Sequence, residues 1–97
     1  MDNDIVLTAD QEEQIRQCGA VGFTPDQVAI VFGFEPWQVH QQFDEKKGCI
    51  YQAYMQGRLQ SELNIRQAVL KSAYNGSTPA QQQIEEYYRV ADAFISE

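Results

Sequence analysis

Residues 24 to 43 read TPDQVAIVFGFEPWQVHQQF, and this stretch predicts two short helices joined by a glycine turn. Thr24 is a good helix N-cap, Pro25 suits the first helical position, and Gln27 completes a capping box. Gly33 stands where a residue with positive φ is needed to end the first helix. The order of helix, glycine turn and helix is typical of a helix-turn-helix.

The two helices should pack on each other through their apolar positions. We expect residues 28 to 32 to supply a buried face, in which Ala29 is small enough for a second helix to approach closely. In the second helix Val39 and Phe43 lie four residues apart and should point inward. That arrangement leaves the other faces to four polar or aromatic residues: Trp37, Gln38, His40 and Gln41.

A first helix should brace this pair. Thr8 and Gln11 repeat the capping-box pattern and predict a helix of about ten residues, with Ile15 and Cys18 facing the core. The connection at residues 19 to 23 contains two glycines, and its valine and phenylalanine should tuck under the motif. Residues 1 to 46 therefore predict a three-helix head, of which we expect the first four residues to fray.

Residues 47 to 97 predict an antiparallel helical hairpin that serves oligomerisation. A long helix from about residue 49 to about residue 74 is followed by Asn-Gly-Ser, typical of a helix C-cap, and by a second Thr-Pro-x-Gln helix start at Thr78. Gly57 inside the long helix suggests close packing against a neighbour. No segment alternates with period two, so the predicted class is all-α. The apolar positions that we assign to contacts between copies are Tyr51, Met55, Leu59, Leu63, Tyr87 and Tyr88.

The net charge of −7 is unevenly distributed along the chain. Residues 1 to 45 carry nine acidic side chains and a single basic one, Arg16, whereas residues 46 to 97 carry six basic and five acidic ones. Neutralisation of phosphates by Lys and Arg supplies most non-specific affinity for DNA. A single head of this charge should therefore bind duplex DNA weakly.

Several classes of function are disfavoured by the sequence. There is no phosphate-binding Gly-x-x-x-x-Gly-Lys-Ser/Thr motif, and one histidine with two separated cysteines specifies no catalytic triad. Cys18 and Cys49 lack the spacing of a zinc site, and we expect both to be reduced, partly buried thiols. We expect a non-enzymatic binding protein without cofactor or metal, located in the cytoplasm and without a membrane span.

The second helix of the motif offers candidates for DNA contact. Gln38 or Gln41 can form a bidentate bond with adenine, and His40 can donate to guanine or phosphate. Lys46 and Lys47 follow the helix directly and are placed to meet phosphates. An equally good interpretation is that they are solvent-exposed residues of the connection between two helices. For Trp37 we favour packing on the long helix over contact with DNA.

One set of residues carries a resemblance to a known family. It comprises the run from Phe23 through Ala29 and Gly33 to Phe43, then AYMQG at residues 53 to 57, Glu62-Leu63, and AYNGSTPA at residues 73 to 80. In this order and spacing, the chain resembles the small terminase subunits of tailed bacteriophages over roughly residues 8 to 90.

The resemblance implies a helix-turn-helix joined to a hairpin that assembles into a homo-oligomeric ring. It also implies that the ring recognises double-stranded viral DNA at a packaging site in the host cytoplasm. The ring would then present this DNA to the large terminase subunit, a separate motor with ATPase and nuclease activities. Several weak heads on one DNA gain from effective concentration, which offsets the acidic charge of each head.

Two alternatives stay open. The run from Gly22 through Phe43 to Lys46 also looks like the DNA-binding head of TetR-family repressors, but the 54 residues after Phe43 are too few for the ligand-binding domain of that family. The third interpretation is an acidic helical protein-interaction module that binds a basic partner and no DNA.

Overall fold

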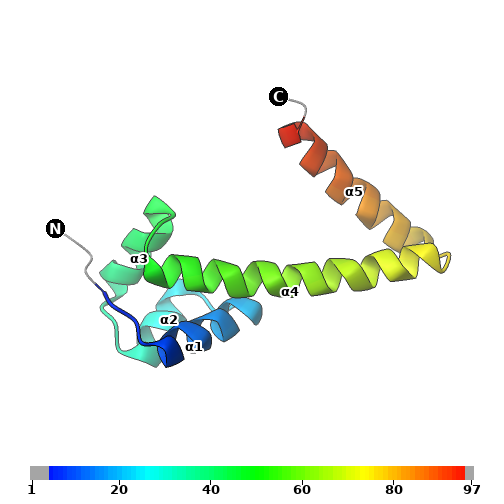
Figure 1. Cartoon of the computed structure of the whole chain (residues 1–97). Helices are drawn as coiled ribbons and strands as arrows, with labels where there is room; N and C mark the ends of the chain where they lie inside the picture. The colour runs from blue at the N-terminus through cyan, green and yellow to red at the C-terminus, as the bar shows by residue number, and fades with distance from the viewer. Residues whose placement is uncertain (1–4, 96–97) are drawn as a thin grey trace. The chain divides into compact units, whose positions relative to one another are not determined.

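The computed structural model describes residues 5 to 95, which form five α-helices and no strand (Figure 1). The all-α class is therefore confirmed, and the four N-terminal residues expected to fray lie outside the described part. The helices in chain order are α1 (Ala9–Ala20), α2 (Pro25–Phe32), α3 (Pro36–Glu45), α4 (Cys49–Tyr74) and α5 (Thr78–Ile95).

The chain divides into two compact units inside α4. One unit comprises residues 1 to 61 and the other residues 62 to 97, whereas the division expected from the sequence lay between residues 46 and 47. The boundary lies further along because the first turns of α4 belong to the core of the head. Ile50, Ala53 and Tyr54 of α4 are all buried there.

Side-chain caps define where the first two helices begin. Thr8 Oγ1 accepts from the backbone N of Gln11 at 3.1 Å, while the Gln11 side chain accepts from the Thr8 N at 3.0 Å. Thr24 and Gln27 form the same reciprocal pair, so both predicted capping boxes are confirmed. Gly33 ends α2 with φ 73°, the left-handed conformation expected of it.

The core of the first unit takes one fully buried aliphatic side chain from each of its four helical segments: Ile15, Val28, Val39 and Ile50. Tyr54 closes this core, since its hydroxyl donates to the carbonyl of Phe23 at 2.7 Å while its ring is buried. The hydrogen bond satisfies the one polar atom that the ring carries into the interior. It also ties α4 to the loop before α2.

Two glycines let α1 and α4 approach very closely. A Cβ atom added at Gly57 would lie 1.8 Å from the backbone oxygen of Arg16, and one added at Gly19 would lie 2.0 Å from that of Tyr54. Both distances are far below contact distance, so only glycine fits at either position. The close packing predicted from Gly57 is confirmed, and Gly19 supplies the matching surface on α1.

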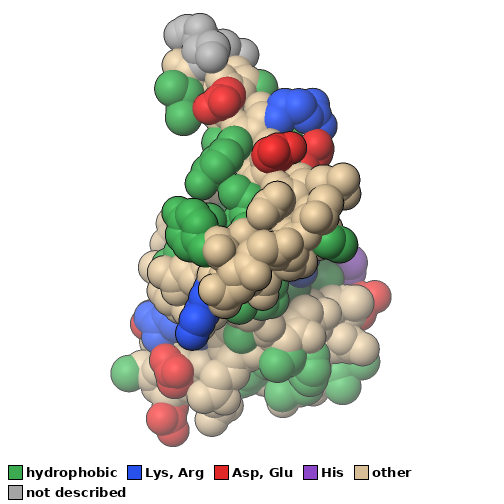
Figure 2. Space-filling view, turned by 90° about the vertical axis from the view of Figure 1, so that its right-hand side faces the viewer, with side chains coloured by type: hydrophobic (Ala, Val, Ile, Leu, Met, Phe, Trp, Pro, Cys, Tyr) green, Lys and Arg blue, Asp and Glu red, His purple; other side chains and the backbone are tan. Residues whose placement is uncertain are grey.

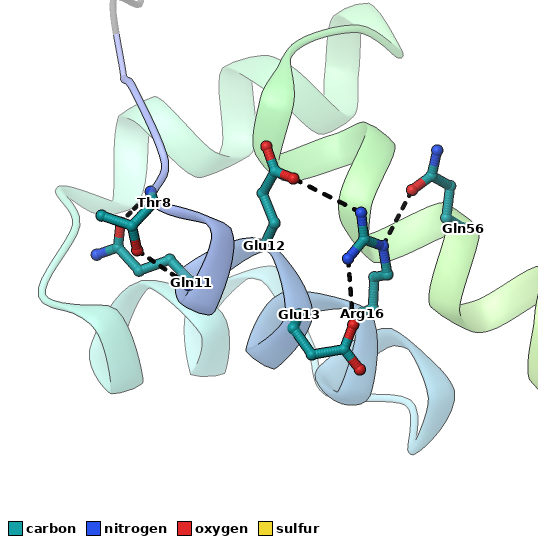
Figure 3. A network of polar contacts seen from close by, with 6 residues as sticks. All are labelled: Thr8, Gln11, Glu12, Glu13, Arg16 and Gln56. Atoms are coloured by element: carbon teal, nitrogen blue, oxygen red, sulfur yellow. Dashed lines mark hydrogen bonds and ion pairs between the residues drawn. The ribbon is translucent and has the colours of Figure 1, made fainter.

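Beside this crossing, Arg16 connects α1 to α4 through a small polar network (Figure 3). Its guanidinium group pairs with Glu12 at 3.6 Å and with Glu13 at 3.1 Å, and its Nε donates to the Gln56 side chain at 3.2 Å. The lone cation of residues 1 to 45 is thus already engaged by two carboxylates. It leaves no free positive charge on α1, α2 or α3.

Some residues expected in the core are exposed. Val28 and Ala29 are buried and Phe32 packs against the core, but Ile30 and Val31 are 79% and 58% exposed, so the prediction of a continuous buried face was wrong for these two. Successive helical residues turn by about 100°, and a helix that packs on one side cannot bury five in a row. Val21, expected to tuck under the motif, is also exposed.

The second unit contains the end of α4, a tight turn and α5. Gly76 adopts φ 97°, as expected of this C-cap, and the N of Ser77 donates to the Ser72 carbonyl at 3.1 Å. Helix α5 begins at Thr78, as predicted, and the hydroxyl of the preceding Ser77 accepts from the N of Ala80 at 3.4 Å. The two helices meet near the turn and diverge away from it (Figure 1).

Candidate nucleic-acid interface

Helix α3 carries most of the residues predicted to contact DNA, and its inner face fixes its rotation. Val39 is fully buried, and the Phe43 ring packs edge-on against Tyr51 and Tyr54 with centroids 5.4 and 5.0 Å away. Such contacts hold a helix in one orientation. Of the positions between Val39 and Phe43, His40 is thereby exposed and Gln41 half-buried, whereas Gln42 points into the interior.

The structure brings the predicted residues together on one helix and its C-terminal end. Trp37 is 44% exposed, which is more open than the packed position favoured for it. His40 is also exposed, whereas Gln38 and Gln41 are half-buried. Lys46 and Lys47 follow α3 directly and are both exposed.

Helix α3 begins and ends at residues whose local sequence favours a helix end. Pro36 occupies the first turn, and the N of Glu35 donates to the Gln38 side chain at 3.3 Å, which ties the entry of the helix. Lys46 ends the helix in the left-handed conformation, with φ 56°, a region that side-chain-bearing residues enter rarely. The direction of the Lys46 side chain is thus set by the helix end.

The residue that sequence reasoning missed is Gln42, which is 3% exposed. Its side-chain oxygen accepts from the backbone N of Ile50 at 2.8 Å and of Tyr51 at 3.1 Å. The first N–H groups of a helix have no partner within the helix, so Gln42 supplies from α3 the cap that α4 lacks in its own sequence. The only sequence signal was a long helix starting after Gly48 without a Ser, Thr, Asp or Asn to cap it.

Gly48 makes this cap possible. Its φ is 109°, and a Cβ added there would lie 2.5 Å from the side-chain Cδ of Gln42. A side chain at this position would therefore both strain the backbone and displace the capping amide. Gln42 and Gly48 together fix α3 against the start of α4.

An acidic residue engages the one histidine of the chain. The Nε2 of His40 on α3 lies 2.6 Å from the Oδ1 of Asp26 in the first turn of α2. Both side chains are about half exposed or more, so the pair is worth little in stability. It does place a carboxylate directly beside a predicted DNA contact.

Glu45 has a similar relation to two further candidates. Its carboxylate accepts from the Gln41 amide at 3.2 Å and lies 4.0 Å from the Lys47 ammonium group. Gln41 also has a buried side-chain oxygen that accepts no hydrogen bond from the described residues.

The residues assigned to contacts between copies fall into two groups. Tyr51 and Met55 pack against the core of the head and are half-buried. Leu59, Leu63 and Tyr88 are exposed, while Arg66 lies over the Tyr87 ring at 4.0 Å from its centroid. The second group is therefore the better placed to meet another chain.

The remaining chemistry is sparse. Cys18 and Cys49 are free thiols, as expected, and burial raises the pKa of the Cys18 thiol, which keeps it protonated at neutral pH. Within residues 5 to 95, no three His, Cys, Asp or Glu side chains gather where a metal could bind. Over the same residues, no helix has the length and hydropathy that a membrane span requires.

Comparisons with protein-family models, with curated proteins and with solved structures found no match.

Proposed function

We propose that this protein is a non-enzymatic DNA-binding subunit of the small-terminase kind. In this role it recognises viral double-stranded DNA in the host cytoplasm and presents it to a large terminase motor for packaging. The observation that carries the proposal is α3, which exposes Trp37 and His40 beside the half-buried Gln41 and ends at two exposed lysines. Its inner face is held by Val39, Phe43 and Gln42, so that the outer face is rigid.

The charges of the head make it a weak reader of DNA. Asp26 and Glu45 lie beside His40 and Lys47, and each carboxylate repels a phosphate that approaches its neighbour. Among the described residues no carboxylate pairs with Lys46, which makes it the strongest candidate for a phosphate contact. A protein of this design gains useful affinity when several heads bind one DNA.

The exposed apolar surface of the second unit supports the proposal that several copies of the chain assemble. Among its described residues, 62 to 95, only Ala73 and Ala80 are buried, whereas Leu63, Ile65, Tyr88 and Phe94 are exposed. Figure 2, which looks toward the turn, shows hydrophobic side chains along the rising α5. Large exposed apolar surfaces mark sites of association. We infer that copies of the chain cover this surface and form a homo-oligomeric ring.

Hollows on the hairpin offer places for the side chains of a second copy. One is lined by residues of both helices that include Leu70, Tyr74, Ile84 and Tyr88, and another by residues that include Ile65, Val69 and Pro79. Both lie within the second unit, close to the turn. Apolar side chains that insert there remove surface from water on both partners.

One observation favours a second candidate function. The pairing of His40 and Lys47 with carboxylates is also what an acidic protein-interaction module would show, in which the head binds a basic partner and no DNA. A TetR-like regulator shares the DNA contact but not the ring. The resemblance of the whole chain, including the hairpin, favours the terminase role over both.

Two measurements separate these functions. We expect a labelled duplex to bind at low salt, where electrostatic attraction is least screened, and to dissociate as salt is added. We also expect light scattering to show an oligomer larger than a dimer at micromolar concentration. Failure to bind any duplex at low salt would leave the interaction module, and DNA binding by a plain dimer would leave the regulator.

The α3 assignment has its own test. Gln41→Ala should change the preference between duplex sequences, because Gln can form paired hydrogen bonds with a base edge. Gln52→Ala, on the exposed side of α4, is the matched control and should leave the preference unchanged. If Gln41→Ala weakens all sequences equally, α3 does not read bases.

A further inference from the structure

The outward face of α2 is apolar in its middle and acidic at its start. Ile30 and Val31 are 79% and 58% exposed, and Gln27 lies one turn before them on the same face. Asp26, four residues before Ile30, has a side chain that is 68% exposed. Figure 2 shows hydrophobic side chains also at the bottom of the molecule, where α1 and α2 lie.

Nothing in the DNA-binding role uses these two aliphatic side chains. Residues 9 to 45 contain one cation, Arg16, and it is held by Glu12 and Glu13. Among the described residues the Asp26 carboxylate contacts the His40 ring but no Lys or Arg, and a surface that joins large aliphatic side chains to such a carboxylate repels phosphate, whether in DNA or at an anionic membrane. A ligand for this face must therefore be apolar and cationic.

We propose that the outward face of α2 is a docking surface for a basic amphipathic segment of another protein. The apolar side of that segment covers Ile30 and Val31, and its Lys or Arg side chains meet Asp26 one turn away. The charge of the head attracts such a segment over a distance as well, because residues 1 to 45 hold nine acidic side chains.

The hairpin of a second copy fits this face less well. Of the cations in its second unit, Arg66 pairs with Glu62 and stacks on Tyr87, and Arg89 pairs with Glu86. Within residues 62 to 95, Lys71 is the cation for which no such partner is found. The hairpin of another copy therefore offers apolar side chains but little positive charge.

The probe is a synthetic helical peptide of leucine and lysine, with the leucines on one face. Its binding to the full chain is measured by titration calorimetry, and the contacted residues are identified from amide chemical-shift changes. A peptide in which glutamine replaces leucine has the same charge and controls for simple electrostatic attraction. We expect shifts centred on residues 26 to 31 and clearly weaker binding of the glutamine peptide.

The variant Ile30→Gln with Val31→Gln should weaken binding of the leucine peptide about tenfold or more, since two apolar contacts are lost. Both side chains are exposed, so the fold should persist, and circular dichroism checks this. Val6→Gln with Val21→Gln is the matched control, because these exposed apolar residues belong to the same unit and are not among the residues assigned to contacts between copies. The control should bind within about twofold of the unmodified chain.

Asp26→Asn separates this docking surface from the DNA contact. The change should weaken peptide binding, because it removes the carboxylate that meets the cations, and should strengthen DNA binding, because it removes a charge beside His40. The two effects have opposite signs. Loss of DNA binding in all variants with intact peptide binding would reject the DNA role and leave the α2 surface standing.

Three results would overturn the α2 assignment. The first is a set of chemical-shift changes centred on the hairpin instead of residues 26 to 31. The second is equal affinity of the Ile30→Gln/Val31→Gln variant and its control for the leucine peptide. The third is a fall in the oligomer mass of that variant, which would make the face a contact between copies.

Discussion

Gln42 shows how a single side chain can connect two helices that the sequence presents as separate. Its amide oxygen accepts two backbone hydrogen bonds at the start of α4, while its own backbone belongs to α3. The C-terminal end of α3 and the N-terminal end of α4 therefore cannot move apart without exposing unpaired donors. Lys46 and Lys47 lie in the short connection between these two ends, which Gln42 holds together.

Gln42→Met should destabilise the protein by about 2–4 kcal/mol, because the shape is nearly kept while the two N–H groups lose their acceptor in a buried position. Urea denaturation measures the change in the free energy of unfolding. Gln52→Met, at an exposed position of α4, should change it by less than about 0.5 kcal/mol. Equal midpoints for the two variants would show that the cap contributes nothing.

The pair of His40 and Asp26 differs from Gln42, because breaking it should change the free energy of unfolding very little. Both side chains are open to water, so their pairing adds little to stability. The pair places a negative charge of α2 next to α3, where it bears on the DNA binding that we propose.

At the scale of the elements, helix ends were predicted well because their signals are local. The capping boxes at Thr8 and Thr24 and the left-handed Gly33 and Gly76 all depend on residues within one turn, and all are confirmed. The start of α5 at Thr78 was also predicted, while the Ser77 hydroxyl that faces the N of Ala80 was not.

What the sequence could not give is which side of a short helix meets its neighbours. The run from Val28 to Phe32 is apolar throughout, and composition alone does not say that Ile30 and Val31 face outward. Gln42 was missed for the same reason, because its partners are eight and nine residues away and belong to another helix. The candidate DNA contacts could be listed from the sequence, but the carboxylates beside them could not.

The crossing of α1 and α4 rests on backbone contact between Gly19 and Gly57 and their partners. Gly57→Ala tests this crossing, because we expect it to destabilise the protein although helix propensity alone would make it stabilising. In an open helix this change stabilises by about 1 kcal/mol, whereas here the methyl group meets the Arg16 carbonyl. We expect a net loss of about 1–3 kcal/mol in chemical denaturation.

Gln60→Ala is the matched control for that crossing, because Gln60 is exposed on the same helix. It should be neutral or slightly stabilising. A Gly57→Ala variant as stable as this control would mean that α1 and α4 do not cross closely.

At the scale of the whole molecule, the two compact units differ in how much apolar surface each buries within itself. Residues 5 to 61 bury at least one aliphatic side chain from every helix, whereas residues 62 to 95 bury only two alanines. Two helices joined by a turn bury too little apolar surface to be stable by themselves. The contacts between copies that we propose would therefore fall on the second unit.

Leu63→Gln with Phe94→Gln should weaken assembly, since both side chains are exposed in the single chain and apolar. We expect the association constant to fall by about tenfold or more and the mass seen by light scattering to move toward that of one chain. Val6→Gln, an exposed apolar position of the first unit, should leave the mass unchanged. An unchanged mass for the Leu63/Phe94 variant would place the contacts between copies elsewhere.

The central claim is that α3 and the lysines after it bind DNA, and a salt titration of duplex binding tests it most directly. Lys46→Ala with Lys47→Ala should weaken binding to all duplex sequences alike and should reduce the slope of log affinity against log salt by about 0.9 for each lysine that contacts a phosphate. A double variant with the affinity and salt slope of the unmodified protein would contradict the account.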